Sequence, residues 1–165
     1  MAPLALTTEY RIPKRRISAE VLLLGHPRKV VTLFLHELAE THAGAERPSD
    51  LLNGGGEFFP AIEPPGKLVL LHRDSVLVIS VAAEAEFPPS EPEGSLPDLT
   101  QATKIPVEVI LQDGSHVRGT IQFVMPQGRD RLIDFMNAPD RFITVREESL
   151  ARLINKRRIV RIAVL

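Results

Sequence analysis

Residues 47–59 read RPSDLLNGGGEFF, and residues 131–143 read RLIDFMNAPDRFI. Both stretches carry Arg, Asp, Asn and Phe at the same spacing and without a gap. The matched positions are Arg47, Asp50, Asn53 and Phe58 in the first stretch, and Arg131, Asp134, Asn137 and Phe142 in the second. Repetition of this kind indicates a repeated structural unit, so we expect the fold to be one unit used twice.

The match extends to both sides of this motif. Downstream, LVLLHRDSVLVISV at residues 68–81 aligns with ARLINKRRIVRIAV at residues 151–164. Upstream, ISAEVLLLG from Ile17 aligns with IPVEVILQD from Ile105. Three matched blocks in the same order predict a tandem duplication.

The duplication divides the chain into four segments. We expect an N-terminal tail at residues 1–16, a first repeat at 17–82, a linker at 83–104 and a second repeat at 105–165. The linker, AEAEFPPSEPEGSLPDLTQATK, is rich in proline and glutamate. Proline removes backbone donors and the polar residues have little to bury, so we expect an extended or disordered connection.

Within each repeat the apolar residues alternate as they do in β-strands. In the second repeat, Val107, Val109 and Leu111 alternate with other residues before an Asp113-Gly114 pair. An Asp-Gly pair between alternating apolar runs is typical of a β-hairpin. The expected strands are residues 19–24, 29–36, 58–62, 67–71 and 76–82 in the first repeat, and 107–112, 117–124, 142–145, 150–154 and 158–164 in the second.

Five short strands per repeat favour a curled arrangement. In a unit of roughly 60 residues, a barrel hides the strand edges that an open sheet leaves unpaired. We therefore expect a mainly β fold of two tandem, small, five-stranded barrels joined by the Pro/Glu-rich linker.

The composition excludes several classes of site. The 165 residues include no cysteine, which rules out disulfides, thiolate nucleophiles and cysteine metal sites. No apolar run approaches the about 20 residues of a membrane-spanning helix. The net charge of −1 does not indicate a polyanionic partner. We expect a soluble, cytoplasmic protein without a membrane partner.

The stretch HELAETH, His36–His42, is the nearest approach to a catalytic motif. Zinc proteases need two histidines four residues apart on a helix, with a glutamate between them as base. Here the residue four positions after His36 is Glu40, and the next histidine follows only at position 42. No Ser, His and Asp set has a recognisable nucleophile elbow either. We expect no catalytic residue, no metal site, no cofactor and no enzymatic activity.

The repeated Arg, Asp and Asn motif has two interpretations. Short Asp and Asn side chains bond nearby backbone groups in turns and helix caps, and an Arg three residues before an Asp can pair with it. In the alternative interpretation, the Asp and Asn side chains present hydrogen-bonding groups, with Arg beside them, to a nucleotide base or a peptide. The residues concerned are Arg47, Asp50, Asn53, Arg131, Asp134 and Asn137.

The second repeat resembles the Sm-like family of small β-barrels, which includes a bacterial RNA chaperone that forms hexameric rings. The first motif of that family is matched by Val107, Val109, Leu111, Asp113, Gly114, Gly119, Thr120 and Ile121. LINKRRIVRIAV, from Leu153, resembles the second motif, with Lys156 at the lysine of the chaperone's Tyr-Lys-His signature. The resemblance implies an Sm-like or SH3-like barrel, repeated in tandem.

The same resemblance bears on ligand binding. Asp134 and Asn137 resemble the family's base-contacting Asp and Met-Asn pair, which implies an RNA site in the second repeat. The two residues are one position too close, however, an insertion MPQGRDRLI precedes them, and Arg157 replaces the signature histidine. The first repeat keeps few of these residues. The Arg, Asp and Asn motif beside a closing hairpin also resembles the motif of an uncharacterised bacterial family. This resemblance implies no activity.

A basic cluster lies on the closing hairpin of the second repeat. It consists of Lys156, Arg157, Arg158 and Arg161. Such a cluster can contact nucleic-acid phosphates, whose attraction falls with salt. It can equally protect an exposed hairpin edge by its charge.

These features together predict a non-enzymatic binding or assembly module. We expect a protein partner or self-association, because the free strand edges of small barrels can pair with other chains and form a homo-oligomer. The alternative is RNA or nucleotide binding through the second repeat.

Overall fold

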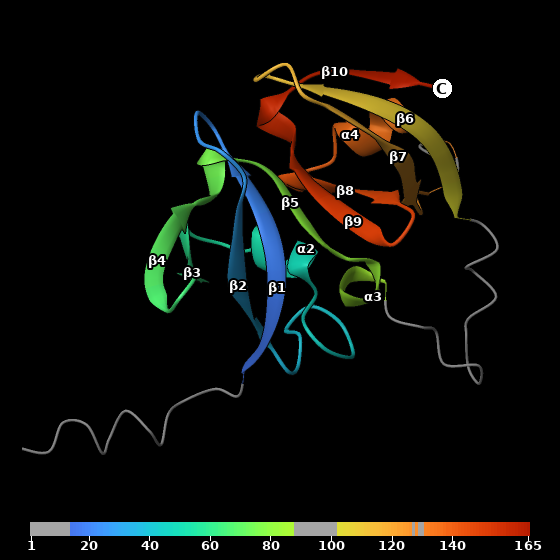
Figure 1. The fold of residues 1–165 in the computed structure, drawn as a ribbon. Helices are drawn as coiled ribbons and strands as arrows, with labels where there is room; N and C mark the ends of the chain where they lie inside the picture. Colours follow the sequence, from blue (N-terminus) through green and yellow to red (C-terminus); the bar gives the residue numbers. More distant parts are fainter. Residues whose placement is uncertain (1–13, 88–101, 127, 129–130) are drawn as a thin grey trace, which may run out of the picture.

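The strands of both repeats join in one antiparallel sheet (Figure 1). The computed structural model describes residues 14–87, 102–126, 128 and 131–165. The first repeat supplies β1 (Lys14–Leu23), β2 (Lys29–His36), β3 (Phe58–Glu63), β4 (Lys67–His72) and β5 (Val76–Ala82). The second supplies β6 (Thr103–Leu111), β7 (His116–Phe123), β8 (Phe142–Glu147), β9 (Leu150–Asn155) and β10 (Ile159–Val164).

Short helical turns connect these strands. The two copies of the repeated motif form α2 (Pro48–Leu52) and α4 (Leu132–Met136). The closing hairpins turn through the 3-10 helices η1 (Arg73–Ser75) and η3 (Lys156–Arg158). A further helical turn, α3 (Ala83–Glu86), follows β5.

The two expected repeats have the same strand order. The ten strands are ordered β10-β6-β7-β8-β9-β5-β1-β2-β3-β4. Each repeat therefore arranges its own five strands in the same order, with the last strand beside the first. The repeats are joined by the pairing of β5 with β9, so β4 and β10 are the outer strands.

The sequence predicts the strands well. All ten expected strands are present in the described part of the chain, and the expected turn at Asp113 is formed, with Gly114 at φ +86°. β1 and β6 begin earlier than expected, at Lys14 and Thr103, so part of the expected tail and linker is strand. The rest of both segments lies largely outside the described residues.

The expectation of two separate barrels needs correction. The ten strands form one unclosed sheet, because β5 and β9 pair with each other and link the repeats. Two clusters of buried apolar residues lie along this sheet, and each draws residues from both repeats. Phe142 and Leu153 join the cluster of the first repeat, whereas Leu77 and Val78 join that of the second. In Figure 1 the two repeats form two curled lobes that meet where β5 and β9 lie side by side.

In the described residues, no helix is long and apolar enough to cross a membrane.

Close packing between β7 and β8 requires a glycine at position 119. A Cβ atom there would lie 2.6 Å from Cγ1 of Val145 and against the carbonyl oxygen of Arg146. By contrast, a Cβ atom at Gly66 would meet nothing within 4 Å.

We predict that Gly119→Ala lowers the free energy of unfolding by about 2 kcal/mol, because the added methyl group forces the two strands apart. Urea unfolding followed by circular dichroism measures this change. Gly66→Ala is the control and should change stability little. Equal stability of the two variants would contradict the close approach of β7 and β8.

Candidate interaction surface at the junction of the repeats

The two copies of the repeated motif have the same backbone conformation. Arg47 and Arg131 precede the helices with extended dihedrals of φ −97°, ψ 158° and φ −84°, ψ 153°. Asn53 and Asn137 end them at φ −86°, ψ 0° and φ −91°, ψ 1°. The matched residues of the sequence therefore occupy matched places in the structure.

The aspartates hold the first turn of each helix. Asp50 Oδ2 accepts a hydrogen bond from the backbone amide of Arg47 at 2.8 Å, and it lies 2.6 Å from Nε2 of His42. Asp134 pairs with the Arg131 guanidinium, with Nε 3.1 Å from Oδ2. The contacts between Arg47 and Asp50 and between Arg131 and Asp134 are local to the turn, which supports the structural interpretation of these four residues.

The two asparagines differ in what they contact. Asn53 Oδ1 accepts a 2.7 Å hydrogen bond from the backbone amide of Phe142, and Asn53 Nδ2 lies 3.4 Å from the Phe142 carbonyl oxygen. Asn53 thus grips the backbone of β8 in the other repeat. Within the described residues, the side chain of Asn137 has no hydrogen bond, and Asn137 is exposed. One asparagine is used at the junction and its counterpart faces solvent.

Lys156, expected in a basic patch, serves the fold. Its ammonium donates hydrogen bonds to the carbonyl oxygens of Met136, at 3.2 Å, and of Ala138, at the end of α4. Partial burial lowers the pKa of Lys156. Arg73 occupies the matched position in the first repeat and donates through Nη2 to the Leu51 carbonyl at 2.9 Å. A cation at this position therefore binds carbonyl groups at the end of each short helix.

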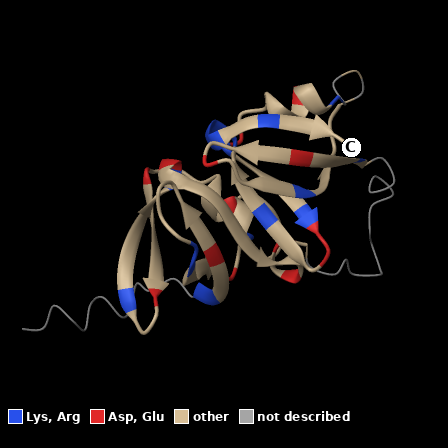
Figure 2. Ribbon diagram, turned by 45° about the horizontal axis from the view of Figure 1, so that its top comes forward, with Lys and Arg blue, Asp and Glu red and all other residues tan. Residues whose placement is uncertain are grey.

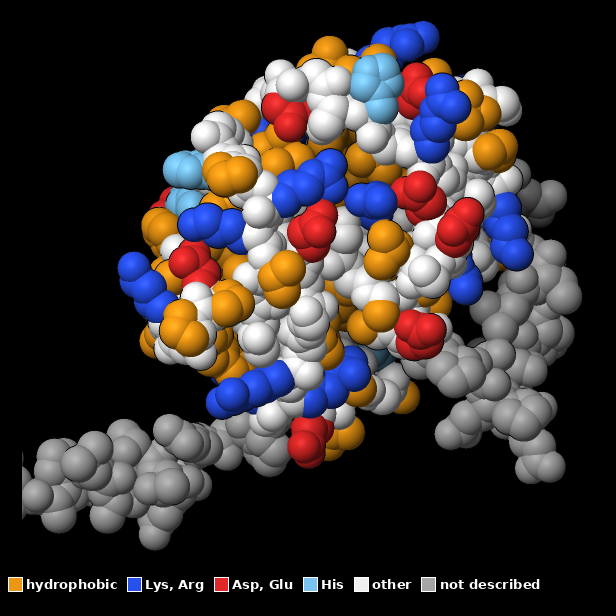
Figure 3. Space-filling model, in the orientation of Figure 1, with side chains coloured by type: hydrophobic (Ala, Val, Ile, Leu, Met, Phe, Trp, Pro, Cys, Tyr) orange, Lys and Arg blue, Asp and Glu red, His pale blue; other side chains and the backbone are white. Residues whose placement is uncertain are grey.

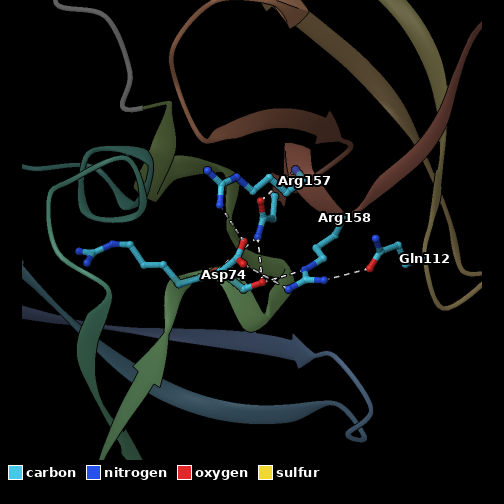
Figure 4. A network of polar contacts seen from close by, with 6 residues as sticks. Asp74, Gln112, Arg157 and Arg158 are labelled. Carbon is cyan, nitrogen blue, oxygen red and sulfur yellow. Dashed lines mark hydrogen bonds and ion pairs between the residues drawn. The ribbon is translucent and has the colours of Figure 1, made fainter.

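Arg158 is also committed to an internal contact (Figure 4). Its Nε donates to the Asp74 carbonyl oxygen at 2.8 Å, and its Nη1 donates to Oε1 of Gln112 at 3.1 Å. Asp74 belongs to the first repeat, so this contact joins the two hairpin turns. Arg157 is 71% exposed on its side chain, and Arg161 is exposed. Of the expected basic cluster, Arg157 and Arg161 carry the charges that face solvent.

Charged residues are spread over the molecule rather than gathered in one patch. Figure 2 shows basic and acidic residues along both lobes, and Figure 3 shows them intermixed over one face. Nucleic-acid binding proteins present concentrated positive charge to the phosphates. The mixed surface therefore gives little support to RNA binding.

The β5–β9 junction is built like a sheet interior. The paired residues are Val78 with Ile154, Ile79 with Leu153, Ser80 with Arg152, Val81 with Ala151 and Ala82 with Leu150. On one face Ile79, Ala151 and Leu153 are 0% exposed, and on the other face Val78 and Ile154 are 5% and 0% exposed. Both faces of the junction are thus covered, and the two repeats form one packed unit.

A polar groove of about 720 Å³ lies beside the junction and contains Asn53 and Phe142. Two of its carboxylates are buried. Glu86 accepts a 3.0 Å hydrogen bond from the Ser49 amide, and burial raises the pKa of Glu86. Burial likewise raises the pKa of Glu46. Glu86 lies in the expected linker, where its proline and acidic composition gave no signal of a buried side chain.

The two histidines of the stretch His36–His42 each lie beside an acidic side chain. His36 Nε2 lies 3.7 Å from Glu46, and His42 lies beside Asp50. Hydrogen bonds with the Ala43 carbonyl and with Asp50 raise the pKa of His42. Across the residues that the structure describes, no three His, Cys, Asp or Glu side chains are grouped as a metal ion would need.

Comparisons with protein-family models, with curated proteins and with solved structures each gave no match.

We predict that Asn53→Ala lowers the free energy of unfolding by about 1–2 kcal/mol, because the amide of Phe142 is left without its acceptor in a half-buried place. Asn137→Ala, the matched change in the other repeat, should leave the stability of the isolated chain nearly unchanged. Urea unfolding of both variants at low protein concentration provides the measurement. Equal losses would show that the two asparagines have the same role.

We predict that Glu86→Gln raises the melting temperature at pH 7. The folded state raises the pKa of Glu86, so ionisation disfavours folding above that pKa, and the penalty is absent below the unfolded pKa of about 4.3. The advantage of the variant should therefore shrink as the pH falls from 7 to 3.5. Glu84→Gln, at an exposed position of the same helix, controls for the loss of a negative charge. A pH-independent difference would contradict the burial of an ionised Glu86.

Proposed function

We propose that this chain is a non-enzymatic assembly module that binds protein through the two outer strands of its sheet. In this proposal each repeat is an Sm-like unit of five strands, and the two units are placed edge to edge in one sheet. The matched strand order of the repeats and the resemblance of the second repeat to Sm-like sequences support this description. The outer strands are the feature on which the proposed function rests.

The backbone of β4 presents hydrogen-bonding groups at one edge of the sheet. The amide of Arg73 bonds to the Glu57 carbonyl at 2.8 Å, so position 73 faces β3. Antiparallel strands alternate the direction of their backbone groups. Val69 and Leu71 therefore also face β3, whereas the amide and carbonyl groups of Leu68 and Leu70 point to the outer edge.

The backbone of β10 does the same at the other edge. The amide of Leu165 bonds to the Pro106 carbonyl at 3.0 Å, so positions 165 and 163 face β6. By the same alternation, the groups of Ile162 and Val164 point outward. Within the part of the chain that the structure describes, neither outer strand has a second neighbour.

The single observation that carries the proposal is the apolar character of both outer strands. Leu68 and Leu70 on β4 are 65% and 66% exposed, and Val160 and Val164 on β10 are 65% and 64% exposed. Exposed apolar edges add strands from other chains unless charge or covering segments prevent it. Strand addition by a protein partner therefore fits these edges.

RNA binding through the second repeat is the second candidate. Arg157 and Arg161 are exposed on the closing hairpin, which favours it. Lys156 and Arg158 are engaged within the protein, which weakens it. The two candidates predict different partners for different surfaces.

We predict that a photoreactive amino acid at position 70, introduced into the full chain in the cells that express it, yields a covalent adduct with protein on illumination. The same amino acid at position 38 is the control, because Leu38 is 77% exposed but lies outside the outer strands. Mass spectrometry of the adducts identifies the partner.

Two outcomes would overturn the proposed function. One is the absence of a protein adduct at position 70 above the level at position 38. The other is an RNA adduct at position 157 together with salt-sensitive RNA retention that is lost in Lys156→Ala with Arg157→Ala.

A further inference from the structure

We infer that the partner of these outer strands is a second copy of this chain, whose β10 pairs with β4 in the register that β5 and β9 already use within the chain. This inference rests on the proposed function and names the partner. The internal junction supplies the template, because β4 is the counterpart of β9 and β10 is the counterpart of β5 in the duplicated sequence.

The exposed residues of the β3–β4 edge are the counterparts of residues buried at the internal junction. The matched pairs are Leu68 with Ala151, Leu70 with Leu153, and Phe58 with Phe142. The first members are 65%, 66% and 53% exposed, and the second members are 0%, 0% and 3% exposed. The same positions are therefore covered where a neighbouring repeat is present and uncovered where it is absent.

The other edge shows the same relation. Val160 and Val164 on β10 are 65% and 64% exposed, whereas their counterparts on β5, Leu77 and Val81, are 0% and 2% exposed. Both halves of an apolar junction are thus present on one chain, at opposite ends of its sheet. Within one chain, β4 and β10 cannot meet without breaking the strand pairing of the sheet that separates them. The β10 of one copy can meet the β4 of another.

The repeated asparagine extends the template to a polar contact. Asn53 bonds the backbone of Phe142 across the internal junction at 2.7 Å. The counterpart pair is Asn137 and Phe58. Within the described residues Asn137 has no side-chain hydrogen bond, and Phe58 is exposed beside β4. Docking in the template register brings Asn137 of one copy to the backbone of Phe58 in the next, which gives the second motif a role.

The template fixes which residues of β10 and β4 pair. At the internal junction Ile79, Ser80 and Val81 pair with Leu153, Arg152 and Ala151. Replacing each residue by its counterpart in the other repeat pairs Ile162 with Leu70, Ala163 with Val69 and Val164 with Leu68. The backbone groups of Ala163 and Val69 face β6 and β3 respectively, so these two residues form a non-hydrogen-bonded pair, where opposing side chains lie closest.

Each copy offers β4 to one neighbour and β10 to another. The assembly therefore grows head to tail and forms a ring where the rotation closes.

The junction between copies lacks two side-chain contacts of the template. At the internal junction Arg152 donates a 3.2 Å hydrogen bond to Ser80, whereas the counterparts of these residues, Val69 and Ala163, form no such bond. The Arg158 and Asp74 contact of the internal junction has Ser75 and Arg157 as its counterparts, which form no ion pair. We therefore expect copies to separate on dilution while the repeats within each chain stay joined.

Engineered disulfides test the register in the full chain. The chain has no cysteine, so Val69→Cys with Ala163→Cys introduces the only thiols. We expect mild oxidation to give a ladder of covalent multimers on a non-reducing gel. Val69→Cys with Arg161→Cys, on the same face but two residues out of register, should give few. Equal yields from both pairs, or none from the first, would overturn the inferred register.

Light scattering across a concentration series tests self-association itself. We expect the parent chain to form a defined oligomer that Leu70→Lys abolishes and Leu38→Lys retains, because a lysine on the outer strand blocks strand pairing. Asn137→Ala should raise the dissociation concentration roughly fivefold, the effect of one hydrogen bond. Circular dichroism confirms that each variant folds.

The outcomes separate this inference from the proposed function. A chain that stays monomeric at all concentrations, yet gives an adduct with a different protein at position 70, overturns the inference and leaves the proposed function standing. A monomeric chain without any adduct at position 70 overturns both.

Discussion

The pairing of β5 with β9 is the interaction on which the rest of the structure depends. β5 lies between β1 of its own repeat and β9 of the other, and every residue from Val76 to Val81 is buried. The apolar clusters on either side share residues across this line. The side chains of Asn53 and Arg158 reinforce it with hydrogen bonds to backbone groups of the opposite repeat. Separating the repeats would expose both apolar surfaces and leave a row of backbone groups unpaired.

Some matched positions of the two repeats lie in different environments. A residue in one repeat lies at the internal junction, while its counterpart lies at an outer edge. Leu153 is 0% exposed and Leu70 is 66% exposed, although both are leucines on matched strands. Conversely, Arg73 and Lys156 make the same kind of contact in both repeats, because each binds the carbonyl end of its own short helix. Comparing the repeats thus distinguishes residues that build the unit from residues that join one unit to another.

The sequence predicts the unit better than the way units are joined. Period-two alternation and the Asp113-Gly114 turn are local signals, so strands and hairpins could be placed from them. Alternation indicates the two faces of a strand but not which strand lies across its edge, so it does not predict the β5–β9 pairing or the unclosed sheet. The charge of Lys156 suggested a surface patch because sequence alone does not show which carbonyl groups lie within reach. Glu86 falls in the expected linker for the same reason, since composition does not show its hydrogen bond to the distant Ser49. The equal spacing of Asn53 and Asn137 does not show that, within the described residues, the side chain of Asn53 has a hydrogen-bond partner and that of Asn137 has none.

Native-state hydrogen exchange at the junction tests the central claim most directly. The amides of Ile79 and Val81 face β9, and those of Ala151 and Leu153 face β5. If the two repeats form one packed unit, these amides exchange only through global unfolding, with the same opening free energy as the amides of β1 and β6. The account is contradicted if the junction amides exchange through a smaller opening free energy while β1 and β6 remain protected.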